Sequence, residues 1–171
     1  MFEPEDFSDA VLIVRSDPYE LLGTHSRHGF NLDDHDWPSA EHYYQAMKFP
    51  PGPHFERIRT ASHPDLATRL GHAWFKRHRP HWRRNRITYM TRALYTKCHT
   101  HREVRDRLLE TAGKRIIECS SFDAFWGCGR DGRGDNRYGR LLERVREKLR
   151  EELFDAEPGV AAPVAESDRS G

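Results

Sequence analysis

The stretch that decides the fold is residues 37–49, which read Trp37-Pro38-Ser39-Ala40-Glu41-His42-Tyr43-Tyr44-Gln45-Ala46-Met47-Lys48-Phe49. It predicts a helix, because Ser39 is a favourable N-cap residue placed directly after Trp37-Pro38. Ala40, Tyr43 and Met47 recur at helical spacing and form the face expected to lie in the core. The four residues 50–53, Pro-Pro-Gly-Pro, end this segment firmly.

A second face of the same helix carries polar side chains. Glu41, Tyr44, Gln45 and Lys48 follow one another at i, i+3, i+4 and i+7, which places them on one side of a helix. Glu41 also lies in the first turn, where the helix dipole favours an ionised carboxylate. These four side chains are candidates for a site, although an ordinary solvated face, with Glu41 and Lys48 far apart, gives the same pattern.

Outward from this helix, apolar periodic segments alternate with breaks that contain Gly or Pro. Residues 11–14 and 115–119 each predict one short strand, and the Gly-, His-, Asp- and Asn-rich residues 23–36 predict a loop. Residues 100–103, Thr-His-Arg-Glu, form a capping-box pattern that predicts the start of a helix. The other predicted helices cover residues 55–58, residues 65–70, a segment that begins at Pro80 and includes Cys98, and about residues 136–154.

Length and composition predict one domain. The 171 residues are enough for a single core, assigned to residues 1–155, while residues 156–171 lack a core-forming pattern and are expected to be a disordered tail. No apolar run is long enough for a membrane span, and the acidic start lacks the pattern of a secretory signal, so a cytoplasmic protein is expected. The three cysteines form no Cys-x-x-Cys pair and are expected to be reduced, and no histidine spacing indicates a metal site.

A glycine-rich loop is the second candidate site. Asp123-Ala-Phe-Trp126 precedes six residues, 127–132, that fit the pattern Gly-x-Gly-x-x-Gly. A dinucleotide-binding unit needs a second strand after the helix that follows, and the sequence has none, so that interpretation is rejected. Gly127 and Gly129 still allow backbone N–H groups to approach a phosphate closely, as a plain flexible turn would also require. Trp126 stands directly before the loop and is a candidate for stacking on a base.

Charge is unevenly distributed, although the formal net charge is only +1. Between Lys76 and Arg107 there are eleven Lys and Arg residues against two acidic residues. A segment of this kind can bind phosphate or a nucleic-acid backbone. For any one of these arginines, a solvated helix face gives the same pattern.

Taken in order, these motifs resemble the NADAR family, also called YbiA-like. The resemblance covers about residues 19–153, and its longest blocks are residues 37–49 and 123–142. Between these blocks lie Ala67-x-x-Leu70-Gly71, Trp82, Met90-x-x-Ala93-Leu94-x-x-Lys97 and Leu108-Leu109-x-Thr111-Ala112.

The resemblance implies a mainly α, multihelical single domain with one or two short strands. It also implies N-glycosidase activity on ribosyl N-glycosides. The family's substrates include phosphoribosylamino-pyrimidine intermediates of riboflavin synthesis and, in other members, ADP-ribose attached to guanine. Glu41 matches the family's catalytic glutamate, and Asp123 and Trp126 match residues that line the same pocket.

The chain departs from the family near its N-terminus. Family members usually have Ser-Asn-Phe shortly after a Tyr, whereas residues 19–25 here read Tyr-Glu-Leu-Leu-Gly-Thr-His and lead into a His-rich loop. The family's ligand contacts in this loop therefore do not carry over, and the substrate stays open.

The resulting hypothesis is hydrolysis of the C1′–N bond of a phosphorylated ribosyl N-glycoside through an oxocarbenium-like state. Glu41 is assigned to activate water or to stabilise the cation, Asp123 to hold ribose hydroxyls or assist protonation, and Trp126 to stack on the base. The glycine loop and basic residues are assigned to hold phosphate. The residues assigned to bind substrate beside Trp126 are Tyr44, Gln45, Trp82, Gly127, Gly129 and Asn136.

Lys48 is assigned as a third catalytic residue. A partly desolvated lysine can attack the aldehyde of an opened ribose and form a Schiff base. The alternative is that Lys48 neutralises a phosphate or pairs with Glu41 or Asp123. No metal or other cofactor is required.

Two other classes of function remain open. One is a non-catalytic module that binds ADP-ribose or a nucleotide. The other is a nucleic-acid binder that uses residues 76–107, and an ADP-ribosylated nucleic acid is also a candidate partner of the enzyme. Binding to a phosphate backbone weakens steeply as salt rises, which separates the nucleic-acid binder from the others.

Overall fold

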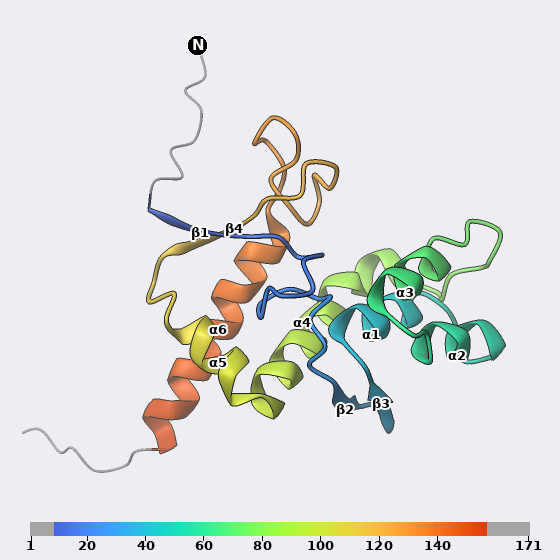
Figure 1. Cartoon of the computed structure of the whole chain (residues 1–171), viewed down its shortest axis with the longest axis horizontal. Helices are drawn as coiled ribbons and strands as arrows, with labels where there is room; N and C mark the ends of the chain where they lie inside the picture. The colour runs from blue at the N-terminus through green and yellow to red at the C-terminus, as the bar shows by residue number, and fades with distance from the viewer. Residues whose placement is uncertain (1–8, 157–171) are drawn as a thin grey trace, which may run out of the picture.

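Two long helices form the frame of the fold, and the shorter elements lie around them (Figure 1). The computed structural model describes residues 9–156. These residues are mainly helical, as the sequence predicts, although they contain four short strands instead of one or two. In chain order the elements are β1 (Ala10–Ile13), β2 (Phe30–Leu32), β3 (His35–Trp37), α1 (Ala40–Ala46), α2 (Pro53–Arg59), α3 (Pro64–Gly71), α4 (Trp82–Thr100), α5 (Arg102–Leu109), β4 (Arg115–Glu118) and α6 (Arg137–Ala156).

Helix α4 joins the two ends of the molecule. At one end, α1 packs against α2, α3 and α4 (Figure 1). At the other end, α5, α6 and the β1–β4 pair lie together, and α4 contacts both α5 and α6. A site between α1 and the β1–β4 pair is therefore formed by residues from both ends of the molecule.

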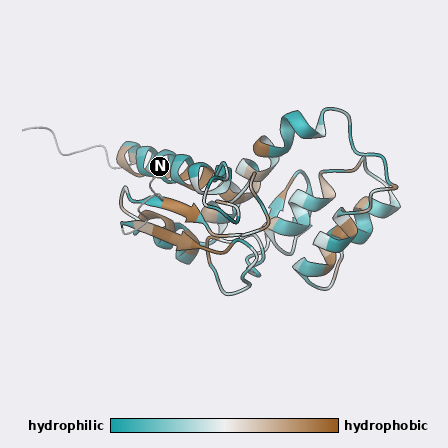
Figure 2. Ribbon diagram, turned by 90° about the horizontal axis from the view of Figure 1, so that it is seen from above, coloured by the Kyte–Doolittle hydropathy of each residue, from teal (hydrophilic) through white to brown (hydrophobic). Residues whose placement is uncertain are grey.

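The two predicted strands pair with each other. Strands β1 and β4 are parallel, with Ala10 opposite Arg115 and Ile13 opposite Glu118. Both are strongly hydrophobic, as the two brown arrows of Figure 2 show, and α6 packs against β4. Because the carboxyl ends of parallel strands meet at one edge, the residues that follow β1 and those that follow β4 are brought side by side.

The segment predicted as a loop contains an antiparallel hairpin, which corrects the expectation for residues 23–36. Phe30 pairs with Trp37 across β2 and β3. Asp33 and Asp34 form the turn with φ of 54° and 60°, the left-handed conformation that two-residue hairpin turns need. The guanidinium of Arg92 pairs with the Asp33 carboxylate and so fixes the turn to α4. The hairpin was missed because its strands are only three residues long.

The decisive helix begins as predicted. Ser39 is the N-cap of α1, and its hydroxyl oxygen accepts a hydrogen bond from the His42 amide. Ala40, Tyr43 and Met47 are all buried. The polar face is buried too, with Glu41 only 1% exposed, and this rules out a solvated face.

The predicted capping box at residues 100–103 is wrong. Thr100 is the last residue of α4, and its hydroxyl donates back to the Thr96 carbonyl over 2.9 Å. His101 is the N-cap of α5 and makes no side-chain capping bond. The helix of the preceding segment continues through Thr100, so its hydroxyl is used inside α4.

Within residues 9–156, no helix is long and apolar enough to cross a membrane. The same residues contain no group of three or more His, Cys, Asp or Glu side chains that could hold a metal ion. Helix α6 ends at Ala156, so nearly all of the tail expected at 156–171 lies outside the described residues.

Candidate active site around Glu41

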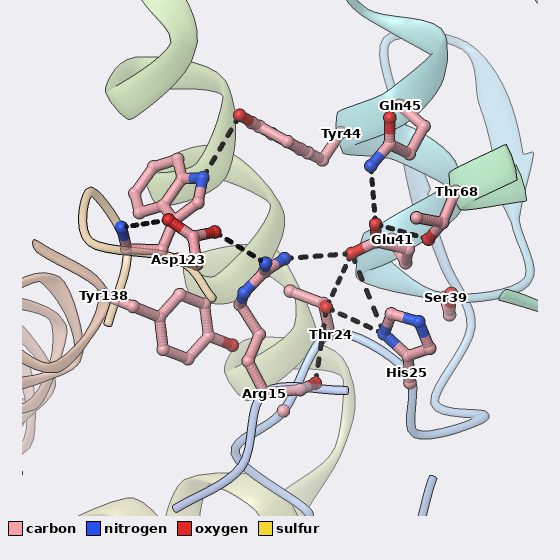
Figure 3. Close-up of polar contacts among 12 residues, drawn as sticks. Arg15, Thr24, His25, Ser39, Glu41, Tyr44, Gln45, Thr68, Asp123 and Tyr138 are labelled. Carbon is pink, nitrogen blue, oxygen red and sulfur yellow. Dashed lines mark hydrogen bonds and ion pairs between the residues drawn. The ribbon is translucent and has the colours of Figure 1, made fainter. Parts of the chain in front are cut away.

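The centre of the site is an arginine that bridges two carboxylates. Arg15 Nη1 lies 3.4 Å from Glu41 Oε2, and Arg15 Nη2 lies 3.2 Å from Asp123 Oδ2 (Figure 3). Glu41 comes from the first turn of α1, Arg15 follows β1, and Asp123 follows β4. The parallel pairing of β1 with β4 explains why Arg15 and Asp123 meet although they are 108 positions apart.

Glu41 is buried and its carboxylate is saturated with donors. Oε1 accepts from Gln45 Nε2 at 2.6 Å and from Thr68 Oγ1 at 2.8 Å, while Oε2 accepts from Thr24 Oγ1 at 2.6 Å and from Arg15. Burial by itself would raise the pKa of Glu41, but Arg15, His25 and the hydrogen bonds lower it to about 2. Glu41 is therefore an ionised carboxylate at neutral pH and a poor proton donor.

Arg15 is held as firmly as Glu41. Its backbone N–H donates to Glu118 Oε1, and its backbone carbonyl accepts from the Thr24 amide at 2.9 Å. Burial would lower the pKa of Arg15, but the nearby carboxylates of Glu41 and Asp123 contribute to raising it, so Arg15 is a fixed cation. Its guanidinium also lies 5.9 Å from the Tyr138 ring centroid.

Asp123 is the carboxylate that reaches the surface. Its side chain is 30% exposed, against 1% for Glu41. Oδ1 accepts from the backbone N–H groups of Phe125 and Trp126, which fixes the carboxylate at the start of the glycine-rich loop. Next to it is a surface pocket of about 430 Å³ lined by Val14, Ser16, Cys119, Ser120, Ser121, Phe122 and Asp123.

An aromatic wall stands beside the carboxylates. Trp126 is 4% exposed, and its indole N–H donates to the Tyr44 hydroxyl at 3.2 Å. Tyr44 also packs against Trp82, with ring centroids 5.2 Å apart, and Trp82 stacks on Tyr89. Burial raises the pKa of Tyr44 to about 12, so its hydroxyl stays protonated. The sequence candidates Tyr44, Trp82 and Trp126 thus share one wall.

Lys48 lies just past the end of α1, on the side of Tyr44. Its Nζ donates to the Gly71 carbonyl at 3.3 Å and lies 5.7 Å from the Tyr44 ring centroid. Burial lowers the pKa of Lys48 to about 8, and Glu41 opposes that shift. A measurable fraction of Lys48 is therefore the neutral amine near neutral pH.

The glycine-rich loop is used mainly to close on itself. The amide of Gly127 donates to the Asp123 carbonyl, and the amides of Cys128 and Gly134 donate to Glu118 and Cys128 carbonyls. A Cβ on Gly127 would overlap the Glu118 carboxylate. Gly127 is therefore required for close packing on β4, and its amide is not free for a phosphate. Gly129 has φ of 67°, a turn conformation that suits glycine.

Asn136 is likewise occupied by the fold. Its Nδ2 donates to the Ile116 carbonyl at 2.8 Å, and its Oδ1 accepts from the Glu118 amide at 2.9 Å. Both polar atoms of the Asn136 side chain thus bind β4, and its assignment as a substrate-binding residue stays a prediction. Gln45 also faces a protein group, because its amide nitrogen donates to Glu41.

Several site residues were missed by sequence reasoning. Thr24, His25 and Thr68 contact or surround the Glu41 carboxylate, and Arg15 joins it to Asp123. Lys97 is fully buried and holds the loop that carries Thr24, by donating to the Leu21 and Gly23 carbonyls and to Ser26 Oγ. The signal for Arg15 was its place directly after a predicted strand, whereas Thr24 and His25 lie in the segment where the chain departs from the NADAR pattern.

Comparison with known proteins gives consistent matches. The model of the NADAR domain matches residues 10–150. N-glycosidase YbiA of Escherichia coli is 38% identical over 134 residues, which are 78% of this chain and 84% of that protein. The riboflavin biosynthesis protein PYRR of Zea mays is 35% identical over 89% of this chain and 26% of its own length. The NMR structure of E. coli YbiA superimposes with a TM-score of 0.79 at 34% identity, over 89% of this chain and 91% of that one.

Proposed function

Because this chain belongs to the NADAR family, we propose that the Glu41 pocket is the active site of an N-glycosidase for phosphorylated ribosyl N-glycosides. The chain is a hydrolase acting on N-glycosyl compounds, as its relatives' names indicate. The observation that supports the assignment of the site is the buried, donor-saturated carboxylate of Glu41, coupled through Arg15 to Asp123. The substrate and the role of each residue are what we propose beyond family membership.

Cleavage of the C1′–N bond builds positive charge on the ribose ring. A fixed carboxylate next to that charge stabilises the transition state without having to reorganise. Glu41 fits this role, because its pKa of about 2 keeps it ionised and its four donors keep it in place. Of the two roles considered for Glu41, stabilisation of the cation is therefore favoured over uptake of a proton from water.

Asp123 and the aromatic wall would position the rest of the substrate. The Asp123 side chain is partly exposed, and in each of its hydrogen bonds the carboxylate is the acceptor. It is therefore suited to accept hydrogen bonds from ribose hydroxyls. Trp126 and Tyr44 would border the base. Trp126 is already enclosed by protein, so we propose contact with the ring edge or a small exposed part of the indole rather than a full stack.

The phosphate would bind to cations rather than to the glycine loop. The amides of Gly127, Cys128 and Gly134 are used within the protein. Arg86, in the basic segment, lies with its guanidinium carbon 3.3 Å from the Phe125 ring centroid, and its Nε is buried without a hydrogen-bond partner among residues 9–156. Arg86 is near enough to Tyr44 to affect its pKa, as Arg15 is. Arg86 and Lys48 are the cations we assign to phosphate.

Lys48 has a second candidate role, which a chemical test separates from the first. As a neutral amine it can attack the C1′ aldehyde of opened ribose, losing water and forming a Schiff base. Borohydride present during turnover would reduce that bond and add the ribosyl fragment's mass to the peptide that contains Lys48, and Lys48→Arg would remove the adduct. Turnover without an adduct on any lysine would exclude the covalent route and leave Lys48 as a phosphate ligand.

The substrate is testable with a panel of ribosyl N-glycosides. Riboflavin-pathway phosphoribosylamino-pyrimidines, ADP-ribosylated guanine as the free nucleoside and ADP-ribosylated guanine in nucleic acid would be incubated with the protein, with released base and ribose read by mass spectrometry. The name of the maize relative favours the first of these. Released base confirms the reaction, whereas binding of ADP-ribose without release from any compound would support a non-catalytic module. A cytoplasmic location stays a prediction from the sequence.

A further inference from the structure

His25 connects the buried carboxylate with the surface, in the segment that departs from the family pattern. Its Nδ1 lies 3.1 Å from Thr24 Oγ1 and 3.8 Å from Glu41 Oε2 (Figure 3). Its Nε2 lies 3.5 Å from Asp65 Oδ1. Side-chain exposure rises from 1% at Glu41 through 6% at His25 to 79% at Asp65. The chemistry assigned above gives His25 no role.

The hydrogen bonds fix what His25 does to Thr24. A threonine hydroxyl has one proton, and its shortest contact, 2.6 Å, is to Glu41 Oε2. When Thr24 donates there, its oxygen is left to accept, and His25 Nδ1 is the ring nitrogen in reach. An Nδ1–H imidazole therefore holds the Thr24 hydroxyl in the direction that supports Glu41.

The charges around His25 make its protonation consequential. Glu41 from α1 and Asp65 from α3 favour the imidazolium, while Arg15 and the neighbouring His42 disfavour it. Burial is the largest influence and lowers the pKa of His25 below its usual 6.5. An imidazolium would stand 3.8 Å from the carboxylate whose negative charge is assigned to stabilise C1′.

We propose that His25 is a positioning residue that sets the acid limit of activity. As the neutral Nδ1–H imidazole, it orients Thr24 and leaves Glu41 its full charge. Protonation at Nε2, stabilised by Asp65, places a positive charge beside Glu41 and weakens its support of the cationic ribose. This inference rests on the proposed N-glycosidase function.

The pH profile of kcat/KM is the first test. For the wild-type protein we expect kcat/KM to be constant at neutral pH and to fall in acid, with a midpoint below pH 6.5. Below that midpoint kcat/KM should fall about tenfold per pH unit, as expected for one protonation of the free enzyme. In Asp65→Asn, a substitution at an exposed position, the midpoint moves to lower pH because the imidazolium loses a partner. Lys48, whose pKa is about 8, titrates at higher pH than this acid limb, the part of the profile where kcat/KM falls with falling pH, and so does not contribute to it.

Two substitutions of His25 separate its positioning from its charge. Glutamine can donate to Thr24 but does not titrate, so His25→Gln should keep most of the plateau and lose the acid limb. Phenylalanine does neither, so His25→Phe should lose the limb and lower the plateau as well. His99→Phe is the control, because His99 is half-exposed and pairs with Glu152 on α6, and its profile should match the wild type.

A second readout does not need turnover. The imidazole ¹⁵N shifts of His25 give its midpoint directly, and both Asp65→Asn and Glu41→Gln should lower that midpoint. An acid limb that persists unchanged in His25→Gln, or a midpoint unmoved in Asp65→Asn, would overturn the inference. If no compound of the panel releases its base while the shifts move as expected, the proposed function fails and the coupling of His25 to Glu41 stands.

Discussion

Glu41 shows how its surroundings decide the outcome of a single substitution. Four donors point at its carboxylate, from Arg15, Thr24, Gln45 and Thr68. A glutamine has the same size, but its amide nitrogen would meet donors where an acceptor is needed. The structure therefore predicts that in Glu41→Gln stability falls together with activity.

We therefore expect Glu41→Gln to abolish turnover and to lower the free energy of unfolding by about 1–3 kcal/mol, the cost of leaving a buried donor unsatisfied. Base release and urea unfolding on the same preparation measure the two effects. Glu151→Gln, at an exposed position of α6, is the matched control and should change neither. Near-normal turnover by Glu41→Gln would remove Glu41 from the catalytic role.

Trp126 is a second residue whose burial sets its expected behaviour. It is 4% exposed and packs against Tyr44, Phe125 and Tyr138, so Trp126→Ala should cost about 3–5 kcal/mol of stability, the range for a buried Trp. If the indole also contacts the base, affinity should fall by roughly 1–3 kcal/mol, the range for base–aromatic stacking.

Melting and substrate binding, measured on one sample below its melting temperature, separate these two contributions of Trp126. Trp74→Ala is the control, because Trp74 is 91% exposed and should be replaceable without loss of stability. If Trp126→Ala melts and binds like the wild type, Trp126 belongs neither to the core nor to the site.

At the scale of elements, one of the side chains that join the start of α6 to β4 is Asn136. Asn136, with φ of 44°, precedes α6 and binds the backbone of β4 at Ile116 and Glu118. Asn136→Ala loses both hydrogen bonds and should lower stability by about 1–3 kcal/mol while KM for substrate stays near the wild-type value. A large rise in KM with unchanged melting would restore the substrate-binding role inferred from the sequence.

The loop that supports Glu41 is in turn held by α4. Lys97 is completely buried and donates to three oxygens of residues 21–26. Lys97→Met should leave those acceptors unpaired, cost at least about 1–3 kcal/mol and slow turnover by releasing the Thr24 segment. Hydrogen exchange of residues 21–26 measures the release, and Lys148→Met on the exposed side of α6 serves as control. Unchanged exchange would show that Tyr138, which also binds the Leu22 carbonyl, holds the loop without Lys97.

For the whole molecule, the ionised carboxylate predicts a specific loss of stability in acid. The pKa of Glu41 falls from 4.5 to about 2 on folding, so its contribution is fully present above pH 4.5 and is lost as pH falls through 2. That contribution is on the order of 3 kcal/mol. The difference in unfolding free energy between wild type and Glu41→Gln should therefore shrink between about pH 5 and pH 2. A difference that stays constant over this range would mean that folding does not lower the pKa of Glu41.

What the sequence determined is local. Helix α1, its Ser39 N-cap, the strands β1 and β4, the terminal helix and the family all follow from periodicity and motifs carried by neighbouring residues. The candidates Glu41 and Asp123 also proved to lie together. The helices, the N-cap and the strands depend on residues a few positions apart, which a single sequence records directly. The family, and with it the pairing of Glu41 with Asp123, came from the resemblance of motif blocks that lie far apart in the chain.

Only the tertiary structure decided how the site is completed. Arg15 meets Asp123 across 108 positions, because the parallel pairing of β1 with β4 sets where both strands end. Arg15 also meets Glu41, which is 26 positions away on α1. Thr24, His25 and Thr68 reach Glu41 from a loop and a helix with no shared motif. Asn136 and Gly127 stood beside a site motif but were committed to packing on β4. Periodicity and spacing carry no information about contacts of this kind, since they depend on how separate elements pack against one another.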